Sequence, residues 1–182
     1  MPHTSAERTV RFFCQDESRF GLLPIQRRRI TLNGVKPLGA VQYCFENFYV
    51  YGAVEPTTGA SFFLELPQLN TLNFQIFLNE FADHYQDTLN IVLMDNGSCH
   101  KAKALVIPDN VRCLFLPPYS PELNPIERLW QDVKNQLAWV LPATIEALEY
   151  QVETIIRHYA QAVIQSLTGY PYVVQTVNAL FS

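Results

Sequence analysis

The first regular hydrophobic pattern of the chain lies in residues 8 to 15, where Val and Phe recur along RTVRFFCQ. Side chains alternate between the two faces of an extended strand, so the even-numbered positions share one face, and Asp16 continues that face. Gly, Pro and basic residues mark the stretch from 17 to 39, which favours a long connection with a short strand near residues 29 to 32. We therefore expect a first strand that ends by presenting Asp16.

A β-hairpin is expected next. Residues 47 to 55 and 60 to 66 are rich in Phe, Tyr and Val, and the four residues between them read Pro-Thr-Thr-Gly. Pro presets φ and Gly accepts positive φ, so this sequence is typical of a turn. With the first strand, the hairpin predicts a three-stranded antiparallel meander, whose first strand keeps one edge free for a parallel neighbour.

The hydrophobic period changes to that of a helix between residues 71 and 85, where Asn70 or Thr71 is available as the N-cap. If these residues form a helix, its apolar side chains at helical spacing are Leu72, Ile76, Phe77, Phe81 and Tyr85.

Two short apolar runs follow, at residues 89 to 94 and 111 to 116. Nearly continuous runs of this kind are typical of parallel strands buried between helices. We expect a short helical segment between them, near residues 100 to 105. Amphipathic helical patterns are then found at residues 126 to 137, 144 to 167 and 172 to 181.

This order of elements predicts one α/β domain over residues 1 to 182, with a C-terminal helical extension. Three antiparallel strands and two parallel strands form a mixed five-stranded sheet covered by helices, which is a ribonuclease H-like arrangement. The 182 residues, 48% hydrophobic and 16% charged, suffice for one sizeable core. No stretch approaches the roughly 20 apolar residues of a membrane span, and the N-terminus lacks a signal-peptide pattern, so we expect a cytoplasmic protein with no membrane partner.

Charge and cysteine content limit the classes of function. The net charge of −4 argues against a surface that binds nucleic acid throughout, but it allows a local basic track. No C-x-x-C pair occurs, so the cysteines suit buried reduced thiols better than a zinc site or a disulfide framework. They are Cys14, Cys44, Cys99 and Cys113.

Two aspartates lie where predicted strands end. Asp95 follows the buried strand of residues 89 to 94, at the carboxyl end where open α/β sheets bind ligands. The alternative is that Asp95 only begins a turn with the Asn and Gly that follow it. Asp16 stands at the end of an apolar strand, where a carboxylate is costly unless it is paired or binds a metal. The alternative for Asp16 is an ion pair with a nearby arginine, and its neighbour Glu17 points to the opposite face.

Glu127 lies in the first turn of the helix predicted from residue 126. Asn124 as the N-cap and Pro125 as the first helical residue would make Glu127 part of a capping box. A carboxylate at a helix start is also able to offer an oxygen to a metal. Glu122, five residues earlier in a proline-containing loop, is the competing acid.

The three acids Asp16, Asp95 and Glu127 carry more weight together than singly. Carboxylates within about 4 Å of each other repel by several kcal/mol at an effective dielectric near 20, so a cluster of them requires a divalent cation. Oxygen ligands favour Mg²⁺ or Mn²⁺ over zinc. Two such ions would neutralise the cluster, activate a water and stabilise the leaving oxygen of a phosphodiester.

Three segments, FCQDESRFGL, MDNGSCHK and LPPYSPELNPIERLWQDVKN, together resemble the catalytic domain of DDE transposases of the mariner-like superfamily, including its bacterial insertion-sequence branch. The resemblance covers nearly the whole chain, and the PPYSPELNPIE run is its specific part. It implies that Asp16, Asp95 and Glu127 are the first, second and third catalytic and metal-binding acids. The separation of 127 − 95 = 32 positions is a little shorter than is typical of the family, which keeps Glu122 open as the third acid.

The resemblance implies hydrolysis at transposon ends to free a 3′ hydroxyl, followed by attack of that hydroxyl on target DNA. The partners would be transposon-end and target DNA in the nucleoid of a bacterial cell, with a homodimer as a further expectation. Members of the family usually carry N-terminal helix-turn-helix modules, and here the first strand begins almost at Met1. We therefore expect this DNA-binding region to be absent and a separate chain or region to recognise the transposon ends.

Further residues are candidates for contact with DNA or with the acids. Basic side chains in the connection after the first strand and beside Asp95 suit DNA phosphates, and the alternative is a solvated basic face. A histidine and an asparagine near Asp95 are secondary candidates, because a lone histidine in a loop is more often a capping or surface residue. The basic residues are Arg27, Arg28, Arg29, Lys36, Lys101 and Lys103, and the secondary ones are His100 and Asn96.

Two other functions remain open. The first is that of a catalytically silent transposase remnant that serves as an interaction module. The second is that of a ribonuclease H-like nuclease of other specificity. The presence of all three acids argues against decay of the site, and the PPYSPELNPIE run favours the transposase over other nucleases.

Overall fold

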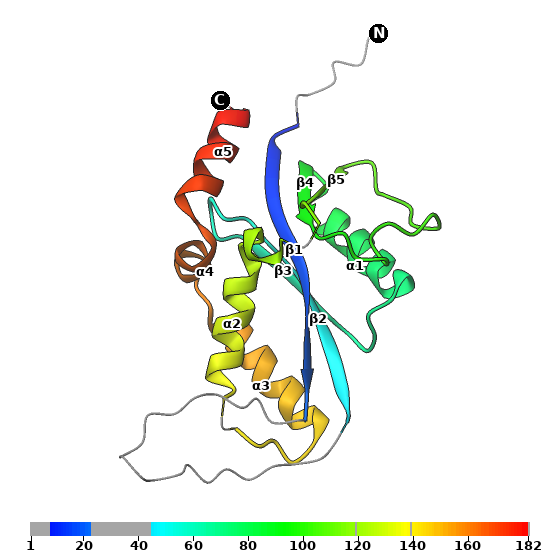
Figure 1. The fold of residues 1–182 in the computed structure, drawn as a ribbon, viewed down its shortest axis with the longest axis vertical. Helices are drawn as coiled ribbons and strands as arrows, with labels where there is room; N and C mark the ends of the chain where they lie inside the picture. The colour runs from blue at the N-terminus through cyan, green and yellow to red at the C-terminus, as the bar shows by residue number, and fades with distance from the viewer. Residues whose placement is uncertain (1–7, 23–44, 119, 139, 182) are drawn as a thin grey trace.

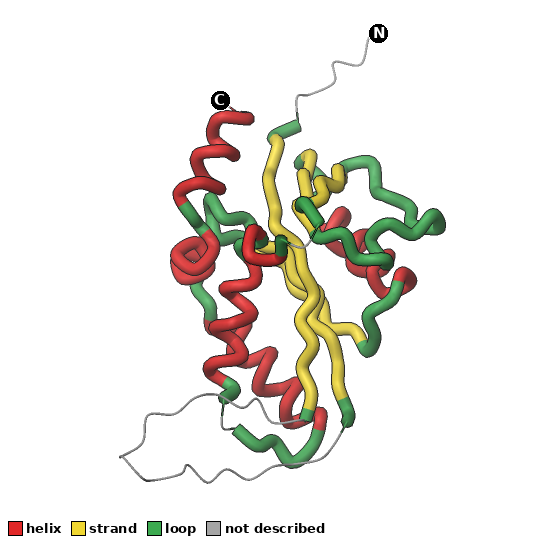
Figure 2. The backbone as a smooth tube through the Cα atoms, in the orientation of Figure 1, coloured by secondary structure: helices red, strands yellow, loops and turns green. Residues whose placement is uncertain are grey.

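The computed structural model describes residues 8 to 22, 45 to 118, 120 to 138 and 140 to 181. Their strands form one sheet in the order β3-β2-β1-β4-β5 (Figures 1 and 2). The first three strands pair antiparallel, whereas β1 with β4 and β4 with β5 pair parallel, which confirms the predicted mixed sheet. The strands are β1 (Val10–Gly21), β2 (Asn47–Val54), β3 (Ser61–Leu66), β4 (Leu89–Met94) and β5 (Val111–Phe115).

The central strand β1 is longer than the sequence predicts. It pairs with β4 only from Val10 to Cys14, but it continues along β2 from Cys14 to Gly21. The expectation that it ends at Asp16 is wrong, because backbone hydrogen bonds to β2 hold the polar stretch regardless of its side chains. As a result, Asp16 lies inside the strand and just beyond the point where its parallel neighbour ends.

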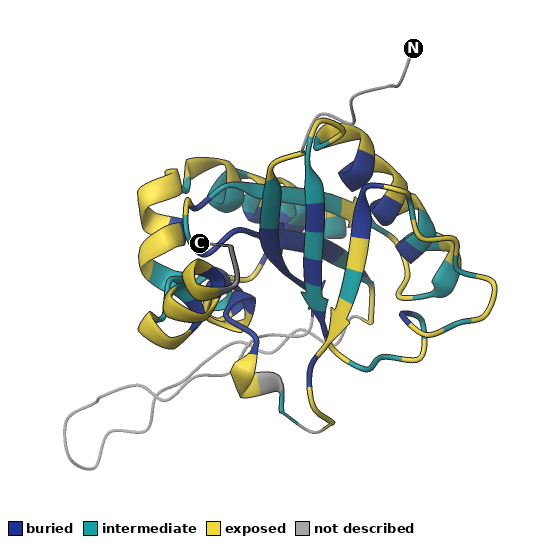
Figure 3. Cartoon of the chain, turned by 90° about the horizontal axis from the view of Figure 1, so that it is seen from above, coloured by how far each residue is buried: buried dark blue, intermediate teal, exposed yellow. Residues whose placement is uncertain are grey.

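Helices cover both faces of the sheet. On one side lies α1 (Thr71–His84), and on the other lie α2 (Ile126–Gln136), α3 (Ile145–His158), α4 (Gln161–Thr168) and α5 (Pro171–Phe181) (Figure 1). Two separate hydrophobic cores result, one under α1 and one under α2 and its successors. Figure 3 shows buried positions gathered in the strands and exposed positions on the outer helix surfaces.

Helix α1 has the predicted bounds but a different buried face. The side chain of Asn70 caps it by accepting from the backbone N–H of Asn73 at 2.9 Å. Two residues of the expected stripe are exposed, Leu72 at 77% and Ile76 at 46%. The predicted Phe77 and Phe81 are buried, and Phe74 takes the inward position instead of Leu72 and Ile76, since an aromatic side chain buries more area than an aliphatic one.

Two predicted helical segments differ in the structure. Turns, rather than a helix, occupy residues 98 to 104. The expected single helix of residues 144 to 167 is two helices, because Tyr159 and Ala160 adopt extended ψ angles of 112° and 149°. The Tyr159 hydroxyl donates to Asp132 on α2 at 2.5 Å, which holds the chain at this break. The hydrophobic period continues on both sides of the break, so the sequence pattern does not reveal it.

The terminal helix is confirmed as α5. In the described part of the chain, no helix combines the length and apolar composition that a membrane span requires. The short strand predicted near residues 29 to 32 lies outside the described residues.

Candidate active site

Asp16 and Asp95 lie at the same level of the sheet, where β1 and β4 separate. The parallel ladder pairs Cys14 with Leu93, and the residues two positions further along each chain are Asp16 and Asp95. β4 ends at Met94, so Asp95 leaves the sheet with 53% of its side chain exposed. The sequence prediction of a strand end that presents Asp95 agrees with this arrangement.

Glu127 comes from the first turn of α2, and the start of this helix is tied to β1. The side-chain amide of Asn124 donates to the backbone oxygen of Gln15, the residue before Asp16, at 2.8 Å. The predicted capping box is therefore wrong: α2 begins after Pro125 without any side-chain cap. Asn124 is buried and holds α2 against the strand, and Glu127 is brought to the same strand as Asp16.

The electrostatics of the acids show that they interact. Burial raises the pKa of Asp16 well above its usual range, and the carboxylates of Glu127, Glu17 and Asp95 raise it further. The pKa of Glu127 is also raised, by partial desolvation first, while Lys134 opposes the shift and Asp95 adds to it. Each carboxylate disfavours ionisation of its neighbours, so the fold leaves negative charge uncompensated here.

The donor set fits a hard divalent cation in its chemistry. All three acids offer oxygen, the ligand that Mg²⁺ and Mn²⁺ prefer. Among the described residues, no three His, Cys, Asp or Glu side chains converge closely enough to hold one ion together in this conformation. The pKa of Asp16, raised by burial first and then by its acidic neighbours, is the observation that favours a cation at this point.

His100 is buried between two carboxylates, rather than being the surface residue that a lone loop histidine suggests. Its Nδ1 lies 2.7 Å from Asp95 Oδ1, and its Nε2 lies 2.9 Å from Glu17 Oε1. Burial lowers the pKa of His100, but hydrogen bonds with Cys99 and Glu17 outweigh burial and raise it to about 11. The ring thus lies between the two acids, in hydrogen-bond contact with Glu17 and in ion-pair contact with Asp95.

Glu17 is the residue that the sequence analysis missed as part of this site. It points to the face opposite Asp16, as expected, and only 5% of its side chain is exposed there. The side-chain amide of Gln15 donates to its Oε1 at 2.9 Å, in addition to the contact from His100. The available signal was a second acid directly after Asp16, together with a histidine five residues after Asp95.

The remaining predicted residues differ in their contacts. The Asn96 amide donates to Leu116 O at 2.5 Å and so joins the loop after β4 to the end of β5. Lys101 lies over the ring of Phe115, 4.9 Å from its centroid, and Lys103 is exposed. The predicted basic residues of the long connection, Arg27, Arg28, Arg29 and Lys36, lie outside the described residues.

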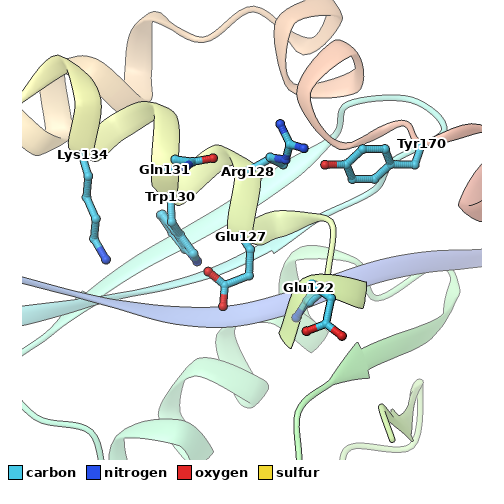
Figure 4. Close-up of a pocket in the computed structure, with 8 residues that line it drawn as sticks. Glu122, Glu127, Arg128, Trp130, Gln131, Lys134 and Tyr170 are labelled. Atoms are coloured by element: carbon cyan, nitrogen blue, oxygen red, sulfur yellow. The ribbon is translucent and has the colours of Figure 1, made fainter. Parts of the chain in front are cut away.

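A cavity of about 460 Å³ opens beside Glu127 (Figure 4). The competing acid Glu122 is exposed on a short 3₁₀ turn, Pro121–Leu123, at the rim of the same cavity. Arg128 and Lys134 from α2 line it as well, with Arg128 lying 5.6 Å from the ring centroid of Tyr170. The buried indole N–H of Trp130 has no hydrogen-bond partner among the described residues, so the cavity wall offers a donor.

The family comparison identifies the class of protein to which this fold belongs. The model of the DDE superfamily endonuclease family matches residues 11 to 149, and the chain belongs to this family. A curated relative, the uncharacterized protein y4pE/y4sA of Sinorhizobium fredii, is 40% identical over 88 residues. That match spans 48% of this chain and 65% of the relative, so it leaves part of the relative without a counterpart.

Solved structures share the fold. The Mos1 transposase paired-end complex with the left transposon end superposes with a TM-score of 0.67 at 18% identity, over 87% of this chain and 51% of that one. The Mos1 mariner paired-end complex with Mn gives a TM-score of 0.69 at 16% identity, over 87% and 51%. This chain thus spans about half the length of the transposase, and the likeness establishes the ribonuclease H-like fold.

Proposed function

We propose that this chain is the catalytic domain of a transposase that cuts DNA and joins DNA strands with the help of divalent cations. The observation that carries the proposal is that Asp16 and Asp95 lie where β1 and β4 separate, and that burial, together with the charges of Glu127, Glu17 and Asp95, raises the pKa of Asp16. Membership of the DDE endonuclease family supports it. In this proposal residues 1 to 182 form one catalytic domain, and α3 to α5 extend it.

Asp16, Asp95 and Glu127 would hold two Mg²⁺ or Mn²⁺ ions. Neighbouring structures of Mos1 complexes are described with Mn and with Mg, which supports the choice of metal. When bound, the ions supply an activated nucleophile and charge stabilisation for the leaving oxygen. The protein supplies a rigid strand for Asp16, a strand end for Asp95, and a helix start fixed through Asn124 for Glu127.

The proposed chemistry has two steps. In cleavage, the oxygen of water bonds to the phosphorus at a transposon end, the bond from phosphorus to the 3′ oxygen breaks, and that oxygen leaves as a 3′ hydroxyl. In strand transfer, this hydroxyl oxygen bonds to a target phosphorus and displaces the target's own 3′ oxygen. The number of phosphodiester bonds is conserved in the second step, and no covalent intermediate with the protein forms.

The DNA partner is supported by the cavity beside Glu127. Arg128 and Lys134 place two cations at this cavity, next to the proposed metal site, where DNA phosphates would be attracted. Lys101 and Lys103 remain candidates for contact on the Asp95 side. We propose transposon-end and target DNA as substrates in the bacterial cytoplasm, a homodimer as the assembly, and a separate region or chain for recognition of the ends.

The test is nicking of supercoiled plasmid DNA in Mg²⁺ or Mn²⁺. We expect nicking by the wild type that EDTA abolishes, and a loss on the order of 100-fold or more in Asp95→Asn, which removes a metal-binding charge at constant size. Asp83→Asn, on the exposed surface of α1, is the matched control and should nick normally. Undiminished nicking by Asp95→Asn would refute the proposal.

The same preparation separates the alternatives. Preferred cleavage of an RNA–DNA hybrid over duplex DNA would identify a ribonuclease H-like enzyme of other specificity. Absence of Mn²⁺ binding in calorimetry, in a folded chain, would identify a silent remnant that acts as an interaction module.

A further inference from the structure

His100 joins the loop after β4 to the centre of β1. Its two ring nitrogens contact carboxylates that belong to different strands, Asp95 at 2.7 Å and Glu17 at 2.9 Å. Only 2% of the His100 side chain is exposed, and its ring lies 4.4 Å from the ring of Phe74 on α1. The ring therefore has a fixed position between the two acids.

The contacts of Asp95 fall on one of its two oxygens. Oδ1 accepts from the backbone N–H of Gly97 at 2.7 Å and lies within hydrogen-bond distance of His100 Nδ1. Two contacts on the same oxygen, one hydrogen bond and one ion pair, restrict the rotation of the carboxylate. A metal ligand whose orientation is set before the ion binds loses less conformational entropy on binding.

Gly97 makes this arrangement sterically possible. A Cβ atom at position 97 would lie 2.9 Å from Asp95 Oδ1 and 3.1 Å from His100 Nδ1. Both distances are tighter than ordinary van der Waals contact, so a larger residue would push the Asp95 carboxylate from its present position beside His100. The close contact of Asp95 with His100 thus explains why a glycine stands at position 97, within the DNGSCH segment.

The other end of the ring is held equally firmly. Glu17 Oε1 accepts from the side-chain amide of Gln15 as well as from His100. The backbone oxygen of Gln15 is in turn the acceptor for Asn124 at the start of α2. A continuous series of polar contacts, an ion pair followed by hydrogen bonds, therefore runs from Asp95 through His100 and Glu17 to the strand that carries Asp16 and to the helix that carries Glu127.

From these contacts we infer that His100 is a positioning residue, which sets the orientation of the Asp95 carboxylate for metal binding through the contact of its Nδ1, with Glu17 holding the ring. The inference rests on the proposed metal site at Asp16, Asp95 and Glu127. It assigns to Glu17 and Gly97 a supporting role in the same arrangement. Partners of this kind behind a metal ligand typically contribute about 10- to 100-fold to metal affinity.

Two amide substitutions separate the two ends of the ring. In His100→Asn the side-chain amide nitrogen takes the place of Nδ1 and keeps a donor for Asp95, whereas in His100→Gln it takes the place of Nε2 and keeps a donor for Glu17 only. The measurement is Mn²⁺ affinity of the metal-free chain, followed by the electron paramagnetic resonance signal of free Mn²⁺. We expect His100→Gln to weaken Mn²⁺ binding about 10-fold or more and His100→Asn to weaken it much less.

A purely structural role for His100 gives a different result, namely equal Mn²⁺ affinity in both variants. That outcome would overturn the inference. Because loss of the ring next to buried Glu17 is able to unfold the chain, the pair is also compared in a Glu17→Gln background, where the partner is neutral. In that background His100→Gln should again weaken Mn²⁺ binding more than His100→Asn does.

Gly97→Ala gives an independent check, because it separates His100 from Asp95 without changing either residue. We expect an intact fold by circular dichroism and weaker Mn²⁺ binding, and unchanged affinity would contradict the inference. His158→Gln, on the exposed end of α3, is the control for loss of a histidine. If the wild type binds no Mn²⁺ at all, the proposed metal site fails, whereas equal binding by all variants refutes only the role of His100.

Discussion

Asp16 and Glu17 are neighbours on β1, yet the protein treats their charges in opposite ways. Glu17 points toward α1, where His100 and the amide of Gln15 both donate to its carboxylate. Asp16 points toward α2, where burial and three nearby carboxylates raise its pKa. The comparison separates two kinds of buried acid: one that the fold itself neutralises, and one whose surroundings favour an added cation.

The two faces of β1 differ in their packing as well. Around Glu17 the core is aromatic, with the Phe74, Phe77 and Phe81 rings of α1 in contact with each other. On the face of Asp16, α2 packs Ile126, Leu129 and Trp130 against the sheet. His100 and Glu17 on the first face are enclosed, whereas Glu127 on the second face lines an open cavity.

Among the substitutions that test the difference between Asp16 and Glu17, Asp16→Asn should have the largest effect on activity. Loss of a central metal-binding charge should reduce metal-dependent nicking on the order of 1000-fold or more, because residues that act as a unit fail together. The same substitution removes the repulsion that raises the pKa of Asp16, so the metal-free chain should become more stable than the wild type. Plasmid nicking and thermal melting in EDTA measure the two effects.

A decrease in both activity and metal-free stability would contradict this account of Asp16. Asp83→Asn on α1 again provides the matched control for loss of an aspartate on the surface.

The pH dependence of stability should show the same uncompensated charge. A carboxyl whose pKa is higher in the folded state than in the unfolded state holds more protons when folded, so ΔG of unfolding falls as pH rises. For Asp16 and Glu127 both pKa values are raised. In EDTA, stability should therefore decline from about pH 4, the usual Asp pKa, up to the raised folded-state pKa of Asp16.

Melting curves between pH 4 and 8 in EDTA test this, with Asp16→Asn as the reference that lacks the main titrating group. The wild type should lose stability relative to Asp16→Asn as pH rises, and saturating Mg²⁺ should reverse the difference. A wild type that gains stability relative to Asp16→Asn over this interval would show that Asp16 is compensated within the fold.

The contrast between Asp16 and Glu17 also shows what a sequence is able to predict. Strand alternation correctly puts the two acids on opposite faces, and the end of an apolar run correctly marks Asp95. The hydrophobic pattern also gave the mixed sheet. These features depend on the periodicity of hydrophobic and polar residues, which neighbouring positions of the sequence show directly.

Features that depend on distant contacts were not predictable in the same way. Asn124 has the sequence context of a helix cap, but its amide donates to Gln15, 109 positions away. The partnership of His100 with Glu17 spans 83 positions, and neither residue shows its partner in the local sequence. The actual length of β1 depends on backbone pairing with β2, which side-chain hydrophobicity does not record.

The smallest expected effect, and the direct counterpart of Asp16→Asn, is Glu17→Gln. Glutamine keeps the size and an acceptor oxygen for His100 but removes the charge that makes this hydrogen bond strong. Hydrogen bonds to charged groups contribute about 1.5 to 3 kcal/mol, so Glu17→Gln should lower the stability of the metal-free chain by roughly that amount. Glu80→Gln, on the exposed surface of α1, should leave stability unchanged.

Opposite signs for the two neighbouring substitutions, stabilising at Asp16 and destabilising at Glu17, are the decisive result in urea unfolding with EDTA present. If both substitutions stabilise the chain, Glu17 also lacks compensation, and the contact with His100 does not balance its burial. If both destabilise it, the carboxylates around Asp16 do not repel one another enough to require a cation. Only the divergent outcome agrees with one acid held by the protein and the other held ready for a metal.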